Sequence, residues 1–176
     1  MERAADIRAV VDTSVLVPAR LRAELQGLAL DGAFTAIWSP WIISELYRTL
    51  TWQWIERSAV GVTTPDGASV TACDLTLANW RRCGESAKRM MEILLATPQW
   101  ELVDPRPPYP PAWTSLDDVW DEPIWAAAVV GRAQYVISNN IHDYPPPGPD
   151  GRHIHDGIEY LSGADFLALL DGVPGG

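Results

Sequence analysis

The sequence predicts an α/β protein whose central parallel β-sheet is flanked by α-helices on both faces. Short apolar runs alternate with longer segments of helical spacing, and this alternation is typical of strand–helix–strand units with parallel strands. The chain has 176 residues, of which 47% are hydrophobic and 20% charged, enough for one folded core. No internal repeat or interdomain linker divides it, so we expect residues 1–176 to form a single domain.

Five short apolar runs predict strands. The first, "IRAVVD", ends in Asp12, which is consistent with a buried strand that turns at the edge of a sheet. The later runs have a similar length and lie between segments of a different character. The predicted strands are residues 7–12, 34–39, 100–104, 134–138 and 157–161.

The segments between these runs have apolar residues at helical spacing. The first of them meets a stop at Asp31-Gly32. The second begins behind Ser39-Pro40, the residue types that helices prefer at the N-cap and in the first turn. The third is long enough for one helix or two. The predicted helices are residues 19–30, 40–57, 71–97, 121–132 and 163–170. Prolines exclude regular structure from the loops at 105–118 and 145–153.

The balance of charge is acidic. The chain has 13 lysines and arginines and 23 aspartates and glutamates, which gives a net charge of −10. A protein that grips nucleic acid usually has a basic face, and here a short stripe on one predicted helix is the nearest feature, which a solvated helix face explains equally well. That stripe is Arg81, Arg82, Lys88 and Arg89.

We expect a cytoplasmic protein that does not enter the membrane. No apolar stretch approaches the roughly 18 residues of a membrane-spanning helix, and the first residues contain no apolar segment of signal-peptide length. Cys73 and Cys83 lie too far apart on a helix for a disulfide. We predict small buried or half-buried side chains for both.

Acidic and amide side chains occupy positions that meet at the carboxyl edge of a parallel sheet, where α/β proteins bind their ligands. Asp12 ends the first strand, and the hydroxyl of Ser14 lies close enough to support the same site. Glu45 lies about one and a half turns into the helix after the second strand. The strand at 134–138 then returns the chain to this edge. The remaining candidates are Asp118, Asp121, Asn139, Asn140 and Asp143.

Such a cluster of carboxylates predicts a bound divalent cation. Like charges a few ångströms apart repel and raise one another's pKa, and a cation removes this cost. Hard oxygen ligands favour Mg²⁺ or Mn²⁺, whereas zinc usually recruits histidine or cysteine. The predicted chemistry is attack of water on a phosphodiester, assisted by an ion that lowers the pKa of that water.

Four segments, in this order, resemble the PIN domain, the fold of metal-dependent ribonucleases that includes the VapC toxins of prokaryotic toxin–antitoxin pairs. They are "VVDTSVLV", "SPWIISEL", "DDVWDEPIWAAAV" and "YVISNNIHDYP". The resemblance runs from about Ile7 to Pro145, and the closing residues 157–170 are similar to the last strand and helix of the family. It implies a Mg²⁺- or Mn²⁺-dependent ribonuclease, with RNA as substrate and a small antitoxin as partner.

The resemblance also implies roles for particular residues. It assigns catalysis and metal binding to Asp12, Glu45, Asp121 and Asp143, and Asp118 matches a position that is often acidic and supports or replaces Asp121. We expect Ser14 and Asn140 to have supporting roles at the same site. Many relatives have an acid where this chain has Asn140. The sequence therefore leaves open whether Asn140 or Asp143 faces the metal.

The same residues can be compared with the requirements of other functions. Asn140 and the acidic net charge also fit a catalytically inactive PIN-like module that binds RNA or a protein. A phosphotransfer enzyme of the haloacid dehalogenase type needs Asp-x-Asp, but the first strand here ends in Asp12-Thr13-Ser14. A dinucleotide site is excluded more firmly, because no Gly-x-Gly-x-x-Gly follows that strand. The choice between RNA and DNA stays open.

Two further features concern histidines and tryptophans. His153 and His155 could chelate zinc as His-x-His, but no third ligand lies at the right spacing, so we predict a solvent-facing loop. Most of the nine tryptophans should be core residues. Trp52 and Trp54, two apart on a helix, cannot both face the core. We expect one of them on a partner-binding or dimer surface.

Overall fold

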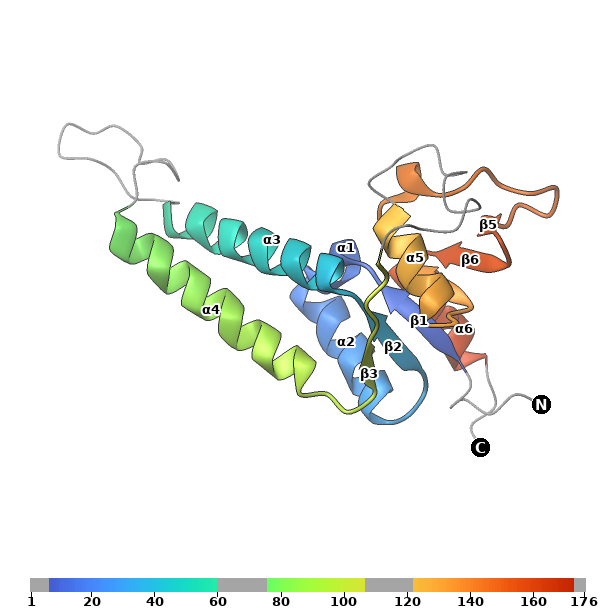
Figure 1. Cartoon of the computed structure of the whole chain (residues 1–176), viewed down its shortest axis with the longest axis horizontal. Coiled ribbons are helices and arrows are strands. Elements are labelled where there is room, and N and C mark those ends of the chain that lie inside the picture. Colours follow the sequence, from blue (N-terminus) through green and yellow to red (C-terminus); the bar gives the residue numbers. More distant parts are fainter. Residues whose placement is uncertain (1–6, 60–75, 107–121, 173–176) are drawn as a thin grey trace.

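The computed structural model describes residues 7–59, 76–106 and 122–172 (Figure 1). Within them a six-stranded sheet has the order β3-β2-β1-β4-β6-β5. All neighbouring strands are parallel except β5 and β6, which are antiparallel. The strands are β1 (Arg8–Val11), β2 (Thr35–Trp38), β3 (Trp100–Leu102), β4 (Tyr135–Ile137), β5 (Ile154–His155) and β6 (Ile158–Leu161). The predicted parallel sheet is confirmed, with one antiparallel edge strand added.

The helices agree with most of the predicted segments. They are α1 (Thr13–Leu16), α2 (Ala19–Leu30), α3 (Pro40–Ala59), α4 (Leu77–Leu95), α5 (Glu122–Val130) and α6 (Gly163–Asp171), with a 3₁₀ turn η4 (Ile141–Asp143). Gly32 terminates α2 with a positive φ of 76°, a conformation that glycine adopts without strain. The Ser39 hydroxyl accepts a hydrogen bond from the backbone N of Ile42 at 3.4 Å and so caps α3 as predicted.

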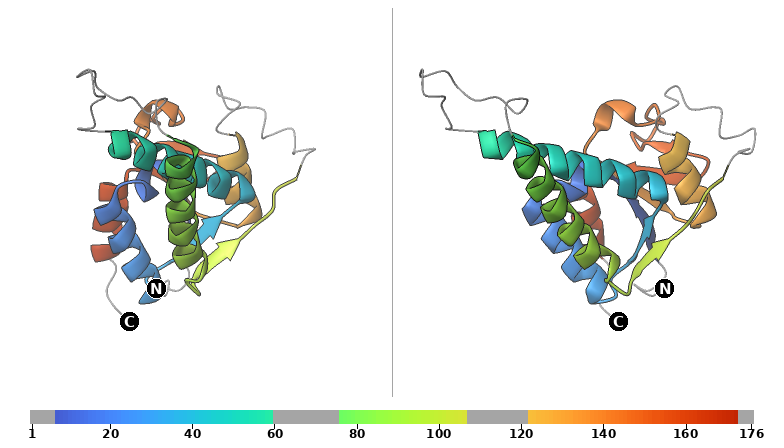
Figure 2. Two further views of the ribbon diagram at one scale, coloured as in Figure 1. Left: turned by 90° about the vertical axis from the view of Figure 1, so that its left-hand side faces the viewer. Right: turned by 60° about the vertical axis from the view of Figure 1, so that its left-hand side comes forward.

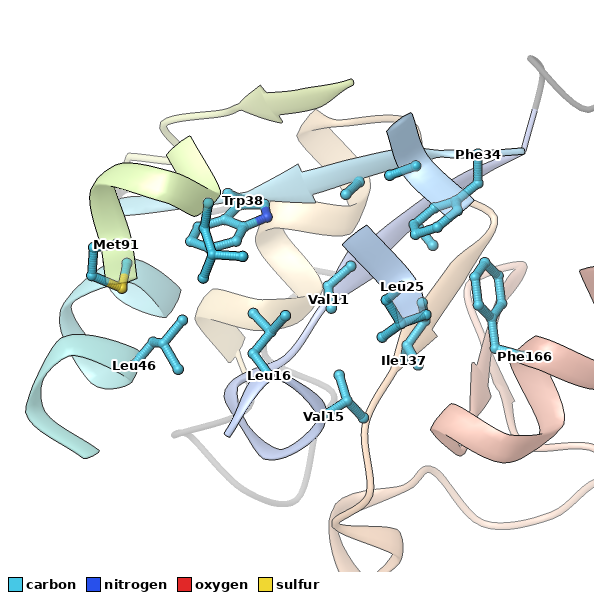
Figure 3. Packing of buried hydrophobic residues seen from close by; sticks show 14 of the residues in the cluster. Val11, Val15, Leu16, Leu25, Phe34, Trp38, Leu46, Met91, Ile137 and Phe166 are labelled. Atoms are coloured by element: carbon cyan, nitrogen blue, oxygen red, sulfur yellow. The ribbon is translucent and has the colours of Figure 1, made fainter. Parts of the chain in front are cut away.

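The two faces of the sheet are covered by different helices. In β1, Ala9 and Val11 belong to a core that α2, α3, α4 and α6 complete, whereas Val10 belongs to a second core under α5. Figure 3 shows the first core, where the rings of Phe34 and Phe166 meet edge to face with centroids 5.0 Å apart. In β1, β2 and β4, alternate residues thus bury apolar area on opposite faces of the sheet. This confirms the prediction of helices on both sides.

Helices α3 and α4 form a long hairpin that projects away from the sheet (Figures 1 and 2). Trp52 on α3 and Trp80 on α4 meet with ring centroids 5.8 Å apart. Trp52 is 44% exposed and lines a groove of about 490 Å³ together with Tyr47 and Trp80. The partner surface predicted for this tryptophan pair stays a prediction. The predicted basic stripe lies exposed on α4, and Cys83 is buried as expected, whereas Cys73 lies outside the described residues.

The predicted solvent-facing loop at His153 and His155 is wrong. Ile154 and His155 form β5 and pair with β6 across a two-residue turn in which Asp156 and Gly157 have φ of 50° and 79°. The His155 ring packs edge to face on Trp125 with centroids 5.2 Å apart. His153 contacts the Pro145 carbonyl through Nδ1 at 2.7 Å. Both histidines therefore have packing roles at the edge of the sheet.

None of the described helices combines the length and the apolar character needed to cross a bilayer.

Candidate active site

The candidate site lies where the sheet reverses its winding. From β1 the chain continues to β2 and β3 on one side, whereas β4 and β6 lie on the other side. In α/β sheets, ligands bind outside the carboxyl ends of the strands at such a switch point. The backbone N of Asp12, just past β1, donates to the carbonyl of Ile137 at the end of β4 at 3.0 Å. Asp12 and Ser138 are thereby placed side by side at this edge.

Asp12 is held by its own loop and by the neighbouring strand. It is only 6% exposed. Its Oδ2 accepts hydrogen bonds from the backbone N of Ser14 at 3.2 Å, from the Ser14 hydroxyl at 2.6 Å and from the Ser138 hydroxyl at 2.9 Å. All three donors meet the same oxygen, so Oδ1 has no hydrogen-bond donor within the described ranges. The carboxylate is thus fixed through its Oδ2 atom.

Glu45 is the second acid at this edge. It is half-buried on α3, and its Oε2 accepts a hydrogen bond from the Thr13 hydroxyl at 3.2 Å. Burial raises the pKa of the Glu45 carboxyl, and the neighbouring charge of Asp12 raises it further. The Thr13 hydrogen bond and the Arg48 charge act in the opposite direction. Asp12 and Glu45 therefore lie close enough for their charges to repel.

A network of hydroxyl and amide groups joins the loops after β1 and β4. The hydroxyls of Ser14 and Ser138 lie 3.1 Å apart. The backbone N of Asn139 donates to the Ser14 hydroxyl at 2.8 Å, and that of Asn140 donates to the Ser138 hydroxyl at 3.1 Å. Ser138 and Thr13 were not among the residues singled out from the sequence. The available signal was that each is a hydroxyl residue directly after a strand or its terminal acid.

Tyr144 is joined to the loop after β4 by a hydrogen bond. Its hydroxyl donates a hydrogen bond to the Ser138 carbonyl. Burial is the main cause that raises the pKa of Tyr144 to about 12, and the charges of Asp165 and Asp12 add to it. The phenol therefore stays protonated at neutral pH and remains a donor. Asn139 links the same loop to α6, because its side-chain Oδ1 accepts a hydrogen bond from the backbone N of Gly163, the first residue of that helix, at 3.1 Å.

The structure brings together part of the predicted set. Asp12, Glu45 and Ser14 lie at one edge, and the exposed Asn140 reaches it through its backbone N. Asp118 and Asp121 lie outside the described residues. The backbone of Asp143 belongs to η4, directly after this edge, but its side chain lies outside the described part. The described residues contain no group of three or more His, Cys, Asp or Glu that could hold a metal.

The carboxyl edge of a parallel sheet is where α/β proteins bind ligands, and carboxylate oxygens are ligands that Mg²⁺ prefers. The sequence model of the PIN domain matches residues 8–142. The chain belongs to the PIN domain family, whose members are generally metal-dependent nucleases. Searches of curated proteins and of solved structures found no significant match. The family and the site together define a nuclease fold.

Glu45→Gln is expected to stabilise the protein in the absence of divalent cations. Glutamine keeps the hydrogen bond from Thr13 but removes the charge that burial and Asp12 disfavour. Glu45 is half-buried, so solvent screens part of the repulsion. We expect a rise in melting temperature of roughly 2–4 °C, which corresponds to about 1 kcal/mol in a domain of this size.

This effect should depend on pH. Because the folded pKa of Glu45 is raised above its ordinary value of 4.5, the wild-type carboxyl contributes stability below that value and loses it as pH rises through the folded pKa. The advantage of Glu45→Gln should grow over this window and then level off. Calorimetric melting in the presence of a chelator measures it, with Glu24→Gln on the exposed face of α2 as the control. An advantage that is independent of pH would contradict the assignment.

Proposed function

We propose that this protein is a metal-dependent endoribonuclease that hydrolyses RNA phosphodiesters, and that it is the toxin of a type II toxin–antitoxin pair. The observation that carries the nuclease proposal is the pair formed by Asp12 and Glu45 at the switch point of a PIN-domain sheet. A cation between these carboxylates would turn their repulsion into attraction. The site would then be ready to bind a phosphate ester.

Mg²⁺ or Mn²⁺ fits the residues that are present. The described carboxylates and hydroxyls at this edge offer oxygen atoms as metal ligands, which hard cations prefer. Asp12 Oδ1 accepts no hydrogen bond within the described ranges. We propose Asp12 and Glu45 as ligands, with Asp121 and Asp143 completing the set. Bound there, the ion would lower the pKa of a water molecule and stabilise charge on the scissile phosphate.

The neighbouring residues hold the carboxylates in place. Hydroxyls of Ser14 and Ser138 orient Asp12, and the Thr13 hydroxyl orients Glu45. Residues that position a ligand in this way typically change metal affinity or activity by about 10–100-fold when they are removed. We propose that Asp118 and Asn140 act in the same supporting way.

The biological setting proposed here rests on the resemblance to VapC toxins. It comprises RNA as substrate, a small antitoxin that restrains the enzyme, and action in the cytoplasm. The exposed Trp52 and the groove beside it offer a surface on which a partner or a second copy of the chain would bury apolar area. This makes a homodimer part of the proposal.

Purified protein incubated with single-stranded RNA and Mg²⁺ or Mn²⁺ tests the proposal. We expect internal cleavage that a chelator abolishes, and a matched single-stranded DNA shows whether the sugar matters. Intact RNA with both ions, together with no ion binding in calorimetry, would contradict the nuclease. Ion binding that is identical in wild type and Asp12→Asn would favour the catalytically inactive module that binds RNA or a protein.

A further inference from the structure

A second hollow lies on the α3–α4 hairpin, with lining residues that differ from those of the Trp52 groove. Its volume is about 290 Å³. The described residues that line it come from both helices: Trp54, Arg57 and Ser58 from α3, and Arg82, Cys83 and Ser86 from α4. The proposed nuclease site at Asp12 and Glu45 uses none of them.

The described lining of this hollow carries positive charge and hydroxyl groups. Arg57 and Arg82 are exposed, none of the described lining residues is acidic, and neither arginine forms an ion pair within the described part of the chain. The Ser86 hydroxyl accepts a hydrogen bond from Arg89 at 3.0 Å, which leaves its own proton available to a ligand. The chain has a net charge of −10. Two guanidinium groups from different helices make the charge of this hollow opposite in sign to that of the whole chain.

A third arginine increases the positive charge nearby. Arg22 on α2 is buried, and its Nη1 donates to the carbonyl of Val17 at 3.1 Å and to that of Leu16. Burial lowers the pKa of the Arg22 guanidinium, and the charge of Arg57 lowers it further. Arg22 and Arg57 therefore repel each other. An anion bound beside Arg57 would relieve this repulsion.

We propose that this hollow binds a backbone phosphate of a single-stranded RNA, with the indole of Trp54 against a neighbouring base. Arginine meets phosphate through two parallel hydrogen bonds, and stacking on tryptophan suits any unpaired base. The inference rests on the proposed ribonuclease function and adds a substrate-binding site to it. Arg57 follows Glu45 by twelve positions on the same helix, or about 18 Å along the axis. One strand of several nucleotides would reach both places.

Binding of a short labelled oligoribonucleotide, measured by fluorescence anisotropy in the Asp12→Asn background, tests this inference without cleavage. We expect Arg57→Gln/Arg82→Gln to weaken binding at least about tenfold. The slope of log affinity against log salt should fall by about 0.7, because the hollow neutralises one phosphate and each neutralised phosphate of a single strand contributes about 0.7. The matched control is Arg20→Gln/Arg81→Gln, which removes two exposed arginines outside the hollow. It should change affinity less than about twofold, and melting temperatures should show that both variants fold.

Titrations with inorganic phosphate and with a mononucleotide distinguish a free small ligand from an RNA strand. If the hollow variant loses affinity for these and keeps its affinity for RNA, the RNA assignment is overturned. Equal weakening of RNA binding by both double variants would show diffuse electrostatic attraction, which also overturns the RNA assignment. The assignment is likewise overturned if the oligoribonucleotide binds neither the Asp12→Asn protein nor its variants. If RNA binding depends on Arg57 and Arg82 while wild type cleaves nothing, the inference stands and the nuclease proposal fails.

Discussion

Asp12→Asn is expected to reduce RNA cleavage by about 10²–10⁴-fold, because a metal-site carboxylate supports several kcal/mol of transition-state stabilisation. Asparagine has nearly the same shape, and its carbonyl oxygen can still accept hydrogen bonds from Ser14 and Ser138. It lacks the negative charge that attracts a divalent cation. Affinity for Mn²⁺, measured by calorimetry, should fall together with activity. The fold should persist, since the repulsion with Glu45 disappears.

The control for this variant is Asp31→Asn, which removes one charge from the exposed turn after α2. Cleavage and Mn²⁺ affinity should remain at wild-type levels there. A comparable loss in both variants would show that net charge, rather than the position of Asp12, sets the activity. Asp12→Asn with activity close to that of wild type would contradict the proposed role of this carboxylate.

Phe166→Ala is expected to lower the free energy of unfolding by about 3–5 kcal/mol, the usual cost of removing a buried aromatic ring. Phe166 is 0% exposed, and its ring packs on Phe34 at 5.0 Å and on Tyr135 at 5.9 Å between centroids. It anchors α6 on the sheet (Figure 3). The melting temperature should fall by roughly 6–20 °C in a domain of this size.

Urea denaturation of Phe166→Ala gives the free energy directly, provided that the slope of the transition is unchanged. Ile93→Ala provides the comparison, because Ile93 lies on α4 and is 56% exposed. That variant should stay within about 0.5 kcal/mol of wild type. If the two substitutions cost the same, α6 does not pack as described.

Much of this fold could be predicted because its patterns are long enough to be distinctive. The helix predicted over 19–30 coincides with α2, since apolar spacing and the stop at Gly32 agree. In β1, alternate residues face two different cores, so the run had to be apolar throughout, as strands buried on both faces are. Because a predicted helix precedes β2 in the sequence and another follows it, a place for this strand in a parallel sheet could be predicted.

The elements that were missed are short. Helix α1 has only four residues, and its start depends on capping of the Ser14 backbone N by Asp12, which no periodicity reveals. Strand β5 has two residues. Its turn, Asp156-Gly157, has the positive φ values of a two-residue hairpin, for which Asp-Gly is a known signal. In the sequence, Asp156-Gly157 closely follows a segment rich in proline and glycine, and no hairpin was predicted there.

The candidate site could be predicted only in outline. An acid after a strand identifies Asp12, because topology alone brings strand ends to one edge. The hydrogen bond from the Ser138 hydroxyl to Asp12 and the neighbouring contact between the loops after β1 and β4 join residues that are far apart in the sequence, 126 positions in the case of Ser138 and Asp12. They depend on the register that pairs Val11 with Ile137, and a one-residue shift would turn these side chains to the other face. Register is set by the packing of the whole sheet and is not visible in a local motif.

A crystal of the wild-type protein soaked in Mn²⁺ would test the central claim most directly, because anomalous scattering locates the ion. We predict a peak within coordination distance of Asp12 Oδ1 and of a Glu45 carboxylate oxygen, with Asp121 and Asp143 completing its ligands. A saturating soak that left no ion on Asp12 or Glu45 would contradict the proposal that this protein is a metal-dependent nuclease.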